Sequence, residues 1–447
     1  MKKEQKRAWG LQCARWLLFA ACLAPCAGTM CAQNAAAPSS VVTQTYDWVE
    51  WKANCDNFFH GPSKDNLFAC GSSTFRSRPF HFLAQSIVPG SGVGGGGQFA
   101  KDLNSDPNKR SSAERSGWQN RFTATGAMTI RQFWLAGVSF VGQHDGYGAG
   151  ANSEEKLMVN FYAHNRDMPI MTFYGLGPNT NVLNSVKFSQ RDTVAGFELY
   201  TPLNTWLNAG GKLEGLWPNI GGVTGASVVS IQAQYTEQTA PGITTQPPMT
   251  REEVYLRPKA HPFPRLELDY FIAYDFFQDT STGHFSFRRF ETKLENTFYP
   301  ITNKRGDPVR DRSFIVRWRY STASAAAGRA VPFYLQETLG GTDIDNQPTL
   351  RAFKDYRFRG PDLMMVQTEY DMRIRSWTYK FVGIGLMATY DAGKVALRRS
   401  DLDFSHLHQG FGGGLVFYLG DKLVFRAAVA LGGGEGAHPY FGLANFI

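Results

Sequence analysis

Apolar and polar side chains alternate along most of this chain, and this alternation limits its possible folds more than any other feature. Between Leu266 and Phe276, apolar residues occupy every second position, while Glu267, Asp269 and Asp275 lie at positions between them. A β-strand places successive side chains on opposite faces of a sheet. The pattern therefore predicts a strand with one apolar face and one polar face.

The same alternation recurs elsewhere, and no stretch of helical periodicity separates the segments that show it. The clearest further strands are predicted at 122–128, 229–236, 314–320 and 423–431. A chain of such strands predicts an all-β fold. Because sheet edges carry unpaired backbone groups, the sheet must close into a barrel or pack against a second sheet.

The first 32 residues predict a cleaved secretory signal. Five basic side chains accompany a short apolar core at 16–23, and Ala32 is a suitable last residue before cleavage. The core is too short for a membrane-spanning helix, which needs about 20 residues. A lipoprotein signal at Cys26 is the alternative, but the preceding Pro25 argues against it.

The composition favours a membrane barrel over a water-soluble sandwich. The chain is 43% hydrophobic with a mean hydropathy of −0.29, yet it contains 34 Phe, 18 Tyr and 10 Trp. Transmembrane barrels have this profile because lipid-facing apolar side chains alternate with polar side chains that face the lumen. A secreted sandwich is the alternative, although a single sandwich usually needs only about 100–250 residues. The aromatic residues expected at the membrane interfaces are Trp206, Trp217, Tyr299, Trp318, Trp377 and Tyr440.

Charge and cysteine content agree with export and give no sign of a nucleic-acid partner. The net charge of +8 includes the five basic residues of the signal, and the sequence has no clustered basic stripe. After the signal only Cys55 and Cys70 remain, and they enclose a short polar loop. In an oxidising compartment this pair predicts a disulfide. A zinc site that adds His60 and His81 is the alternative.

These features divide the chain into three parts. We predict a signal peptide at 1–32, an irregular periplasmic segment with the disulfide loop at 33–85, and an outer-membrane barrel at 86–447. Short connections at 202–205 and 420–421 are predicted to be periplasmic turns. The long polar insertions predicted to be extracellular loops are 100–117, 142–155, 237–252 and 400–408.

No motif in the sequence supports an enzyme, a cofactor or a metal site. Residues 90–97 are rich in glycine, but no βαβ unit follows, so a first barrel strand almost without side chains is predicted there. Arg305-Gly306-Asp307 matches an adhesion tripeptide, although a turn between strands explains it equally. His406 and His408 lack nearby ligands, and no serine nucleophile stands in a catalytic pattern.

A series of short motifs follows in a fixed order between residues 339 and 393. They are Leu339-Gly340-Gly341, Leu350-Arg351-Ala352-Phe353, Arg359-Gly360-Pro361, QTEYDMR at 367–373 and YDAG at 390–393. With residues 173–179 and 191–193, the series resembles the bacterial surface antigen family, the barrel domain of the BamA/TamA superfamily. The resemblance covers most of 86–447. It implies a transmembrane antiparallel β-barrel of about 16 strands.

The resemblance also implies that the element at 350–353 lies at the tip of a long loop folded back into the lumen. Two positions depart from the family pattern: Ala352 replaces the usual glycine, and Ile447 ends the chain where an aromatic residue is typical. Members that handle polypeptides carry polypeptide-transport-associated domains, and residues 33–85 are too short and irregular to form one comfortably. A partner would have to supply such a domain.

Strand parity predicts the partners of Arg351 without reference to the family. Glu369 and Asp391 fall on the polar faces of successive strands, so both carboxylates should point into the lumen. An arginine confined there needs such a partner, and its planar fork suits carboxylates. We predict a lock of Arg351, Phe353, Glu369, Asp391 and Gly393 that pins the loop inside the barrel. A solvated arginine in an outer loop is the alternative.

Three functions fit such a protein in the cell outer membrane. The first is a membrane-assembly or translocation component that works with a periplasmic partner protein. The second is a passive or gated pore, and the third is a structural or adhesive surface protein. The other expected partners are outer-membrane lipid and lipopolysaccharide, together with the outer-membrane assembly machinery.

Overall fold

The structure is a computed structural model that describes residues 55–57, 59–61, 66, 70, 80–103, 118–144, 157–225, 228–304, 306, 308–374, 382–419 and 422–443. The predicted signal peptide, most of the predicted periplasmic segment, Trp377, the 420–421 turn and Ile447 lie outside these residues. Of the tripeptide at 305–307, only Gly306 is described. Within the described ranges, no helix is long and apolar enough to cross a membrane.

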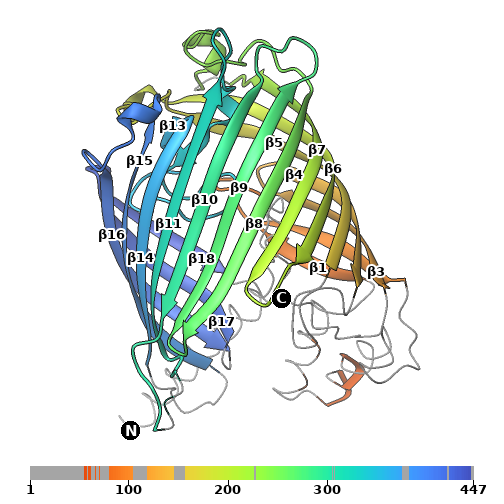
Figure 1. Ribbon diagram of the computed structural model, residues 1–447, viewed down its shortest axis with the longest axis vertical. Coiled ribbons are helices and arrows are strands. Elements are labelled where there is room, and N and C mark those ends of the chain that lie inside the picture. Colours follow the sequence, from red (N-terminus) through yellow and green to blue (C-terminus); the bar gives the residue numbers. More distant parts are fainter. Residues whose placement is uncertain are drawn as a thin grey trace, which may run out of the picture.

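Sixteen strands form one sheet that curls into a barrel, and each strand is antiparallel to its neighbours (Figure 1). Neighbours in the sheet follow the chain order, except that β11 pairs with β14. The predicted all-β class and the strand number are confirmed. The strands of this sheet are β1 (Phe80–Gln85), β2 (Gly94–Asp102), β3 (Trp118–Thr129), β4 (Trp134–His144), β5 (Leu157–Phe173), β6 (Val186–Pro202), β7 (Leu207–Gly222), β8 (Met249–Phe263), β9 (Leu266–Asp279), β10 (Phe287–Phe298), β11 (Arg312–Ala325), β14 (Asp362–Ile374), β15 (Val382–Ala396), β16 (His408–Leu419), β17 (Lys422–Gly432) and β18 (Ala437–Leu443).

The connection between β11 and β14, residues 326–361, is the segment that we call the inserted loop. It contains the short helix η4 (Phe333–Leu335) and the strands β12 (Glu337–Leu339) and β13 (Phe358–Gly360), which form a separate two-stranded sheet. Gly340 and Gly341, just after β12, have φ values of +113° and +55°. Glycine adopts this left-handed region without the steric cost of a side chain. The two glycines therefore let the loop turn sharply after β12.

Strict antiparallel order assigns every connection to one of two ends of the barrel. We call the end with the inserted loop, the β7–β8 connection and the β15–β16 connection the loop end, and the opposite end the turn end. The predicted turn at 202–205 lies at the turn end, and the predicted loops at 237–252 and 400–408 overlap connections at the loop end.

Two of the predicted extracellular loops belong to the other end. The β2–β3 and β4–β5 connections join strands at the turn end, so 100–117 and 142–155 do not share an end with 237–252 and 400–408, and the four cannot all be extracellular. Length and polarity do not fix the end at which a connection lies. The end follows from the number of strands that precede each connection.

The strand predicted at 229–236 is also wrong. This segment lies in the β7–β8 connection and contains the short helix η3 (Ile231–Ala233). Ile231 is fully buried, and Tyr235 packs against the same apolar cluster inside the barrel. Apolar residues there face a packed interior from a turn, so their spacing imitates a strand.

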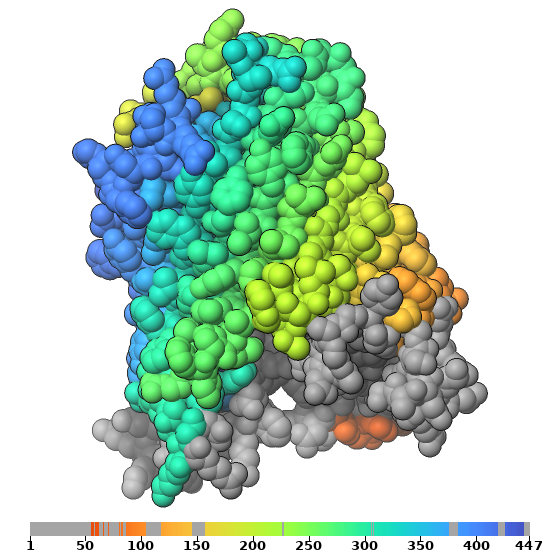
Figure 2. Space-filling model, viewed as in Figure 1, coloured from red at the N-terminus to blue at the C-terminus, as the bar shows by residue number. Residues whose placement is uncertain are grey.

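The two faces of the strands differ as the alternation predicted. Arg317 and Arg319 of β11 point into the lumen, where both form ion pairs, while Phe314 on the opposite face is 41% exposed. In the space-filling view, side chains form a continuous outer wall on the face shown (Figure 2). Two of the aromatic residues predicted at the membrane interface instead lie inside. Tyr299 is 8% exposed and donates to Glu267 Oε2 at 3.0 Å, and Tyr440 contacts Arg351 in the lumen.

Within the described residues, the sheet ends at β1 and β18, and we call this pair of edge strands the seam. No pairing joins β1 to β18 in the described part of the chain, so the predicted closure of the sheet was wrong for these residues. The sequences of these strands explain why pairing between β1 and β18 is weak. β1 has only six residues, β2 begins with four glycines, and Pro439 of β18 has no N–H to donate.

The start of the sheet also shifts the predicted domain boundary. Phe80–Gln85 forms β1, so the sheet begins six residues before the predicted boundary at 86. Within the glycine-rich stretch at 90–97, only residues from Gly94 onward are strand, and they form β2. Exposed Phe80 and Phe82 in β1 fit an outer wall, a pattern too short to recognise from the sequence.

Candidate functional site

Arg351 lies inside the barrel and contacts two carboxylates and a tyrosine. Its Nη1 atom is 3.1 Å from Glu369 Oε2, and its Nε atom is 3.3 Å from Asp391 Oδ2. The Arg351 backbone N–H donates to Asp391 Oδ2 at 3.0 Å, and Nη1 donates to the Tyr440 hydroxyl at 3.3 Å. The Arg351 side chain is only 2% exposed. The structure thus brings Arg351 to both carboxylates that strand parity assigned to the lumen.

Glu369 connects the inserted loop to several strands, because three arginines share its carboxylate. Besides Arg351, Arg317 of β11 lies 3.4 Å from Oε2 and Arg426 of β17 lies 3.0 Å from Oε1. Residues two apart on a strand share a face. Gln367 of β14 therefore points the same way and donates to Asp391 Oδ1 at 3.2 Å. Glu369 therefore joins the inserted loop, β11 and β17 to β14.

Ala352 explains how the loop accommodates a methyl group where the family usually has glycine. Its φ does not lie in the left-handed region, so alanine causes no backbone strain there. The methyl group packs against β16 at Gly410, where an added Cβ would lie 2.3 Å from the Ala352 Cβ. The glycine at 410 therefore leaves the space that the alanine at 352 fills.

Phe353 packs into the wall beside Arg351. Its ring lies 5.3 Å from Phe358 and 5.6 Å from His408, and a Cβ on Gly433 would lie 2.0 Å from it. Gly393, the last residue of the predicted lock, pairs with β14, where an added Cβ would lie 2.7 Å from the Met364 carbonyl oxygen. The absence of a side chain at Gly393 lets β15 and β14 approach each other closely.

A second ionic cluster, which the sequence did not predict, holds the inserted loop. Arg319 of β11 lies 2.8 Å from Glu337 and 2.9 Å from Asp343, both in the inserted loop, and 3.2 Å from Glu291 of β10. Alternation had placed Arg319 in the lumen but could not identify its partners, because Glu337 and Asp343 lie in irregular or short segments. The loop is therefore fixed to the wall by ion pairs at two places.

Arg359 is buried without a carboxylate partner in the described part of the chain. It is 3% exposed, and its Nη1 donates to the Phe333 carbonyl oxygen at 2.7 Å. Its guanidinium lies 5.9 Å from the Phe173 ring centroid and 5.8 Å from that of Phe333. Cation–π contacts of this kind contribute roughly 0.5–2 kcal/mol each.

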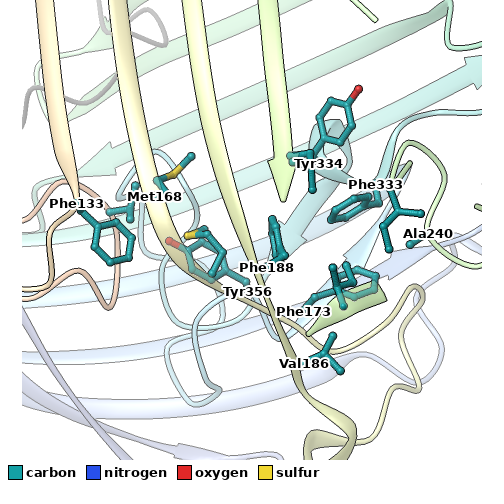
Figure 3. Packing of buried hydrophobic residues seen from close by; sticks show 14 of the residues in the cluster. Phe133, Met168, Phe173, Val186, Phe188, Ala240, Phe333, Tyr334 and Tyr356 are labelled. Carbon is teal, nitrogen blue, oxygen red and sulfur yellow. The ribbon is translucent and has the colours of Figure 1, made fainter. Parts of the chain in front are cut away.

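An apolar cluster fills the barrel interior at the loop end. It joins residues of four connections and the adjoining strands, and Figure 3 shows the rings of Phe173, Phe188 and Phe333 packed together. Phe188 and Phe333 are fully buried, and burying one such side chain contributes about 1.5–3 kcal/mol. The other buried members are Ile87, Val88, Phe133, Leu135, Met168, Met171, Val186, Ile220, Ile231, Ala240, Ile243, Tyr334 and Tyr356.

Outside the barrel wall, the structure joins Cys55 to Cys70 by a disulfide. No group of three or more histidine, cysteine or acidic side chains suited to a metal ion occurs among the described residues. His408 is used in packing: its ring stacks on Phe358 at 3.9 Å, and its Nε2 lies 2.9 Å from the Pro178 carbonyl oxygen.

Lys394 fixes the β15–β16 connection to the barrel. It bonds to Asp403 and donates to the Ser405 carbonyl oxygen at 3.1 Å. The Lys394 ammonium and the Ser405 hydroxyl and N–H donate to the Asp403 carboxylate and lower its pKa to about 2. This loop therefore has an anchor of its own at the loop end.

Comparison with known proteins supports the fold. No protein-family model and no curated protein matches the sequence. Among solved structures, the chain is similar to BamA from Haemophilus ducreyi lacking POTRA domains 1-3, with 10% identity, a TM-score of 0.52, and coverage of 82% of this chain and 69% of that one. It is also similar to CdiB from Escherichia coli, with 12% identity, a TM-score of 0.50, and coverage of 81% and 61%.

CdiB from Acinetobacter baumannii matches with 13% identity, a TM-score of 0.48, and coverage of 81% of this chain and 58% of that one. The chain thus spans about three-fifths of the length of the CdiB proteins. At these identities the likeness concerns architecture. The fold is that of the BamA-type barrel, which is the fold that the ordered motifs at 339–393 implied.

Proposed function

We propose that this protein is an outer-membrane barrel that assists the insertion or translocation of other polypeptides, and that it is neither an enzyme nor a constitutive pore. The observation that carries the proposal is the seam. Edge strands present unpaired backbone N–H and C=O groups, which are templates for another strand. Such edges are costly in lipid. A barrel that keeps them is suited to receiving a strand from another chain.

The interior supports the same proposal. The inserted loop and the apolar cluster fill the lumen at the loop end, and Arg351 and Arg319 attach the loop to the wall. A passive pore needs a continuous water-filled path, whereas the inserted loop and the apolar cluster occupy the lumen at the loop end. This packing favours work at the seam over free diffusion through the lumen.

The proposal includes a location and partners. A signal cleaved after residue 32 would export the chain, with 33–79 and the Cys55–Cys70 disulfide on the periplasmic side and the loop end facing outward. Lipopolysaccharide and outer-membrane lipid would surround the wall, and the assembly machinery would insert it. Since the segment before β1, residues 33–79, is short, a periplasmic partner would supply the domain that receives polypeptides.

Photocrosslinking tests the proposal directly. Phe82 of β1 and Phe441 of β18 are 56% and 71% exposed beside the two edges of the seam. A photoreactive phenylalanine analogue at either position should capture newly exported polypeptides. The same analogue at Val254 of β8, which is 60% exposed on the wall away from the seam, is the control. Capture of lipid alone at all three positions would contradict the proposal.

A further inference from the structure

The β15–β16 connection, residues 397–407, lies against the outer face of the barrel wall. Phe404 of this connection packs beside Trp318 of β11, with 5.9 Å between the ring centroids. Trp318 points outward, because its neighbours Arg317 and Arg319 point into the lumen. The connection therefore covers a part of the wall that would otherwise face lipid.

A shallow apolar groove lies between this connection and the wall. The six residues whose side chains line it are Trp318, Met364, Val366, Ala392, Phe404 and Leu407. Met364 and Ala392 point outward by strand parity, yet each is only 6% exposed. On the same outer face, Tyr390 and Leu386 of β15 follow toward the middle of the wall and are 40% and 43% exposed. The groove therefore continues the apolar surface that faces lipid.

Polar side chains lie on the same outer face, closer to the loop end. Asp362 begins β14 and accepts a hydrogen bond from the Thr322 hydroxyl, while Lys394, near the end of β15, bonds to Asp403. Charged side chains are costly in the hydrocarbon of a membrane, so these groups indicate the level of the lipid headgroups. Polar groups followed by an apolar groove match the order of headgroup and acyl chain in an outer-leaflet lipid.

Two arginines beside the groove can bind an anionic headgroup. Arg398 and Arg399 are exposed, and neither guanidinium forms an ion pair in the described part of the chain. Because Lys394 and Asp403 neutralise each other, the two arginines are opposed only by Asp401 within residues 394–407. The planar guanidinium of arginine suits two parallel hydrogen bonds to one phosphate group.

We propose that this groove binds one lipopolysaccharide molecule, with an acyl chain against Trp318 and Phe404 and a lipid A phosphate at Arg398 and Arg399. Holding the phosphate and the acyl chain of one molecule together distinguishes the groove from the rest of the apolar wall. The inference rests on the location in the proposed function, with the loop end facing outward. It does not depend on the handling of polypeptides.

Native mass spectrometry of the purified full-length protein, titrated with lipid A in detergent, tests the site. The parent protein should bind a first lipid A more tightly than any further one. Arg398→Gln with Arg399→Gln should weaken that first binding by about tenfold or more, because charge-assisted hydrogen bonds to the phosphate are lost. Arg191→Gln with Arg288→Gln is the matched control, since both arginines are exposed on β6 and β10, away from the groove.

Phe404→Ala tests the apolar part of the site. Phe404 is 72% exposed, so losing its ring should weaken the first lipid A without unfolding the barrel. Phe161→Ala, at a residue that is 52% exposed on β5, should leave the affinity unchanged. Leu407→Ala takes the place of Phe404→Ala if that variant loses its heat-dependent shift on unheated gels.

An unchanged first affinity in either the arginine variant or the groove variant would overturn the proposal. Phosphatidylethanolamine is titrated in the same way. If it binds as tightly as lipid A and is weakened by the same substitutions, the assignment to lipopolysaccharide is wrong. These titrations need no polypeptide, so the groove can fail while crosslinking at the seam succeeds, or hold while crosslinking fails.

Discussion

Arg351 and Arg359 lie eight residues apart on the same loop and are equally buried, yet their surroundings differ completely. Arg351 contacts two carboxylates, whereas Arg359 has two aromatic rings and a carbonyl oxygen. Moving an ion out of water costs several kcal/mol unless a partner offsets it. The first arginine therefore holds the loop in place, and the second is tolerated because the aromatic cluster encloses it.

The largest effect should follow from Arg351→Ala. It leaves Asp391 buried without its cation, and breaking a buried pair costs about 3–5 kcal/mol. The folded form on unheated gels should convert to the unfolded form at a clearly lower temperature. Arg310→Ala is the control, since Arg310 is 72% exposed in its pair with Glu267, and exposed pairs contribute about 0–1 kcal/mol. Equal decreases in conversion temperature for the two variants would show that Arg351 does not lock the loop to the wall.

The next effect tests the fit of the loop against β16. Gly410→Ala adds a Cβ that would lie 2.3 Å from the Ala352 Cβ, and overpacking of this kind costs about 1–3 kcal/mol. Adding Ala352→Gly should restore the unfolding temperature. Gly126→Ala is the control, because nothing lies within 4 Å of a Cβ at 126. If the second substitution fails to rescue the first, the two positions are not complementary.

Arg359→Met tests whether Arg359 and Arg351 have different roles in the loop. Replacing a buried, unneutralised cation with an apolar side chain of similar length should change stability by less than about 1 kcal/mol or raise it. Arg351→Met should still destabilise the barrel, because it leaves Asp391 buried without its cation. The gel conversion temperatures of the two methionine variants give the answer. A larger loss at 359 than at 351 would reverse the assignment of roles.

The smallest effect concerns the β15–β16 connection. Because its pKa is lowered to about 2, Asp403 anchors Lys394 fully above its ordinary pKa of about 3.9, and the anchor is lost as the pH falls through about 2. Asp403→Asn should therefore speed tryptic cleavage after Arg398 and Arg399 slightly at neutral pH. Asp401→Asn in the same loop should not. Equal cleavage rates in all three proteins would show that the anchor is unimportant.

Much of the fold was predictable because alternation is local. The faces of β9 and β11 follow from residues such as Leu268 and Arg317, and the same parity aimed Glu369 and Asp391 at the lumen. The strand number came from the family resemblance. The alternation within a strand does not show whether that strand pairs with a given neighbour. The lack of pairing between β1 and β18 in the described residues was therefore not predicted.

The contacts made by irregular segments were not predictable. Arg319 faces the lumen by parity, but Glu337 and Asp343 reach it through turns of the inserted loop. Arg359 lies between two rings, and one of them belongs to η4. Tyr440 resembled an interface residue because aromatics near strand ends usually are, yet it turns inward to Arg351.

Single-channel conductance in planar bilayers tests most directly whether the inserted loop closes the lumen. The parent protein should show almost no steady current, and a variant lacking residues 338–360 should form large, stable openings, because it loses Arg351, Arg359 and their packing together. Only protein with a heat-dependent gel shift is compared. A parent protein that conducts as freely as the deletion variant would contradict this account.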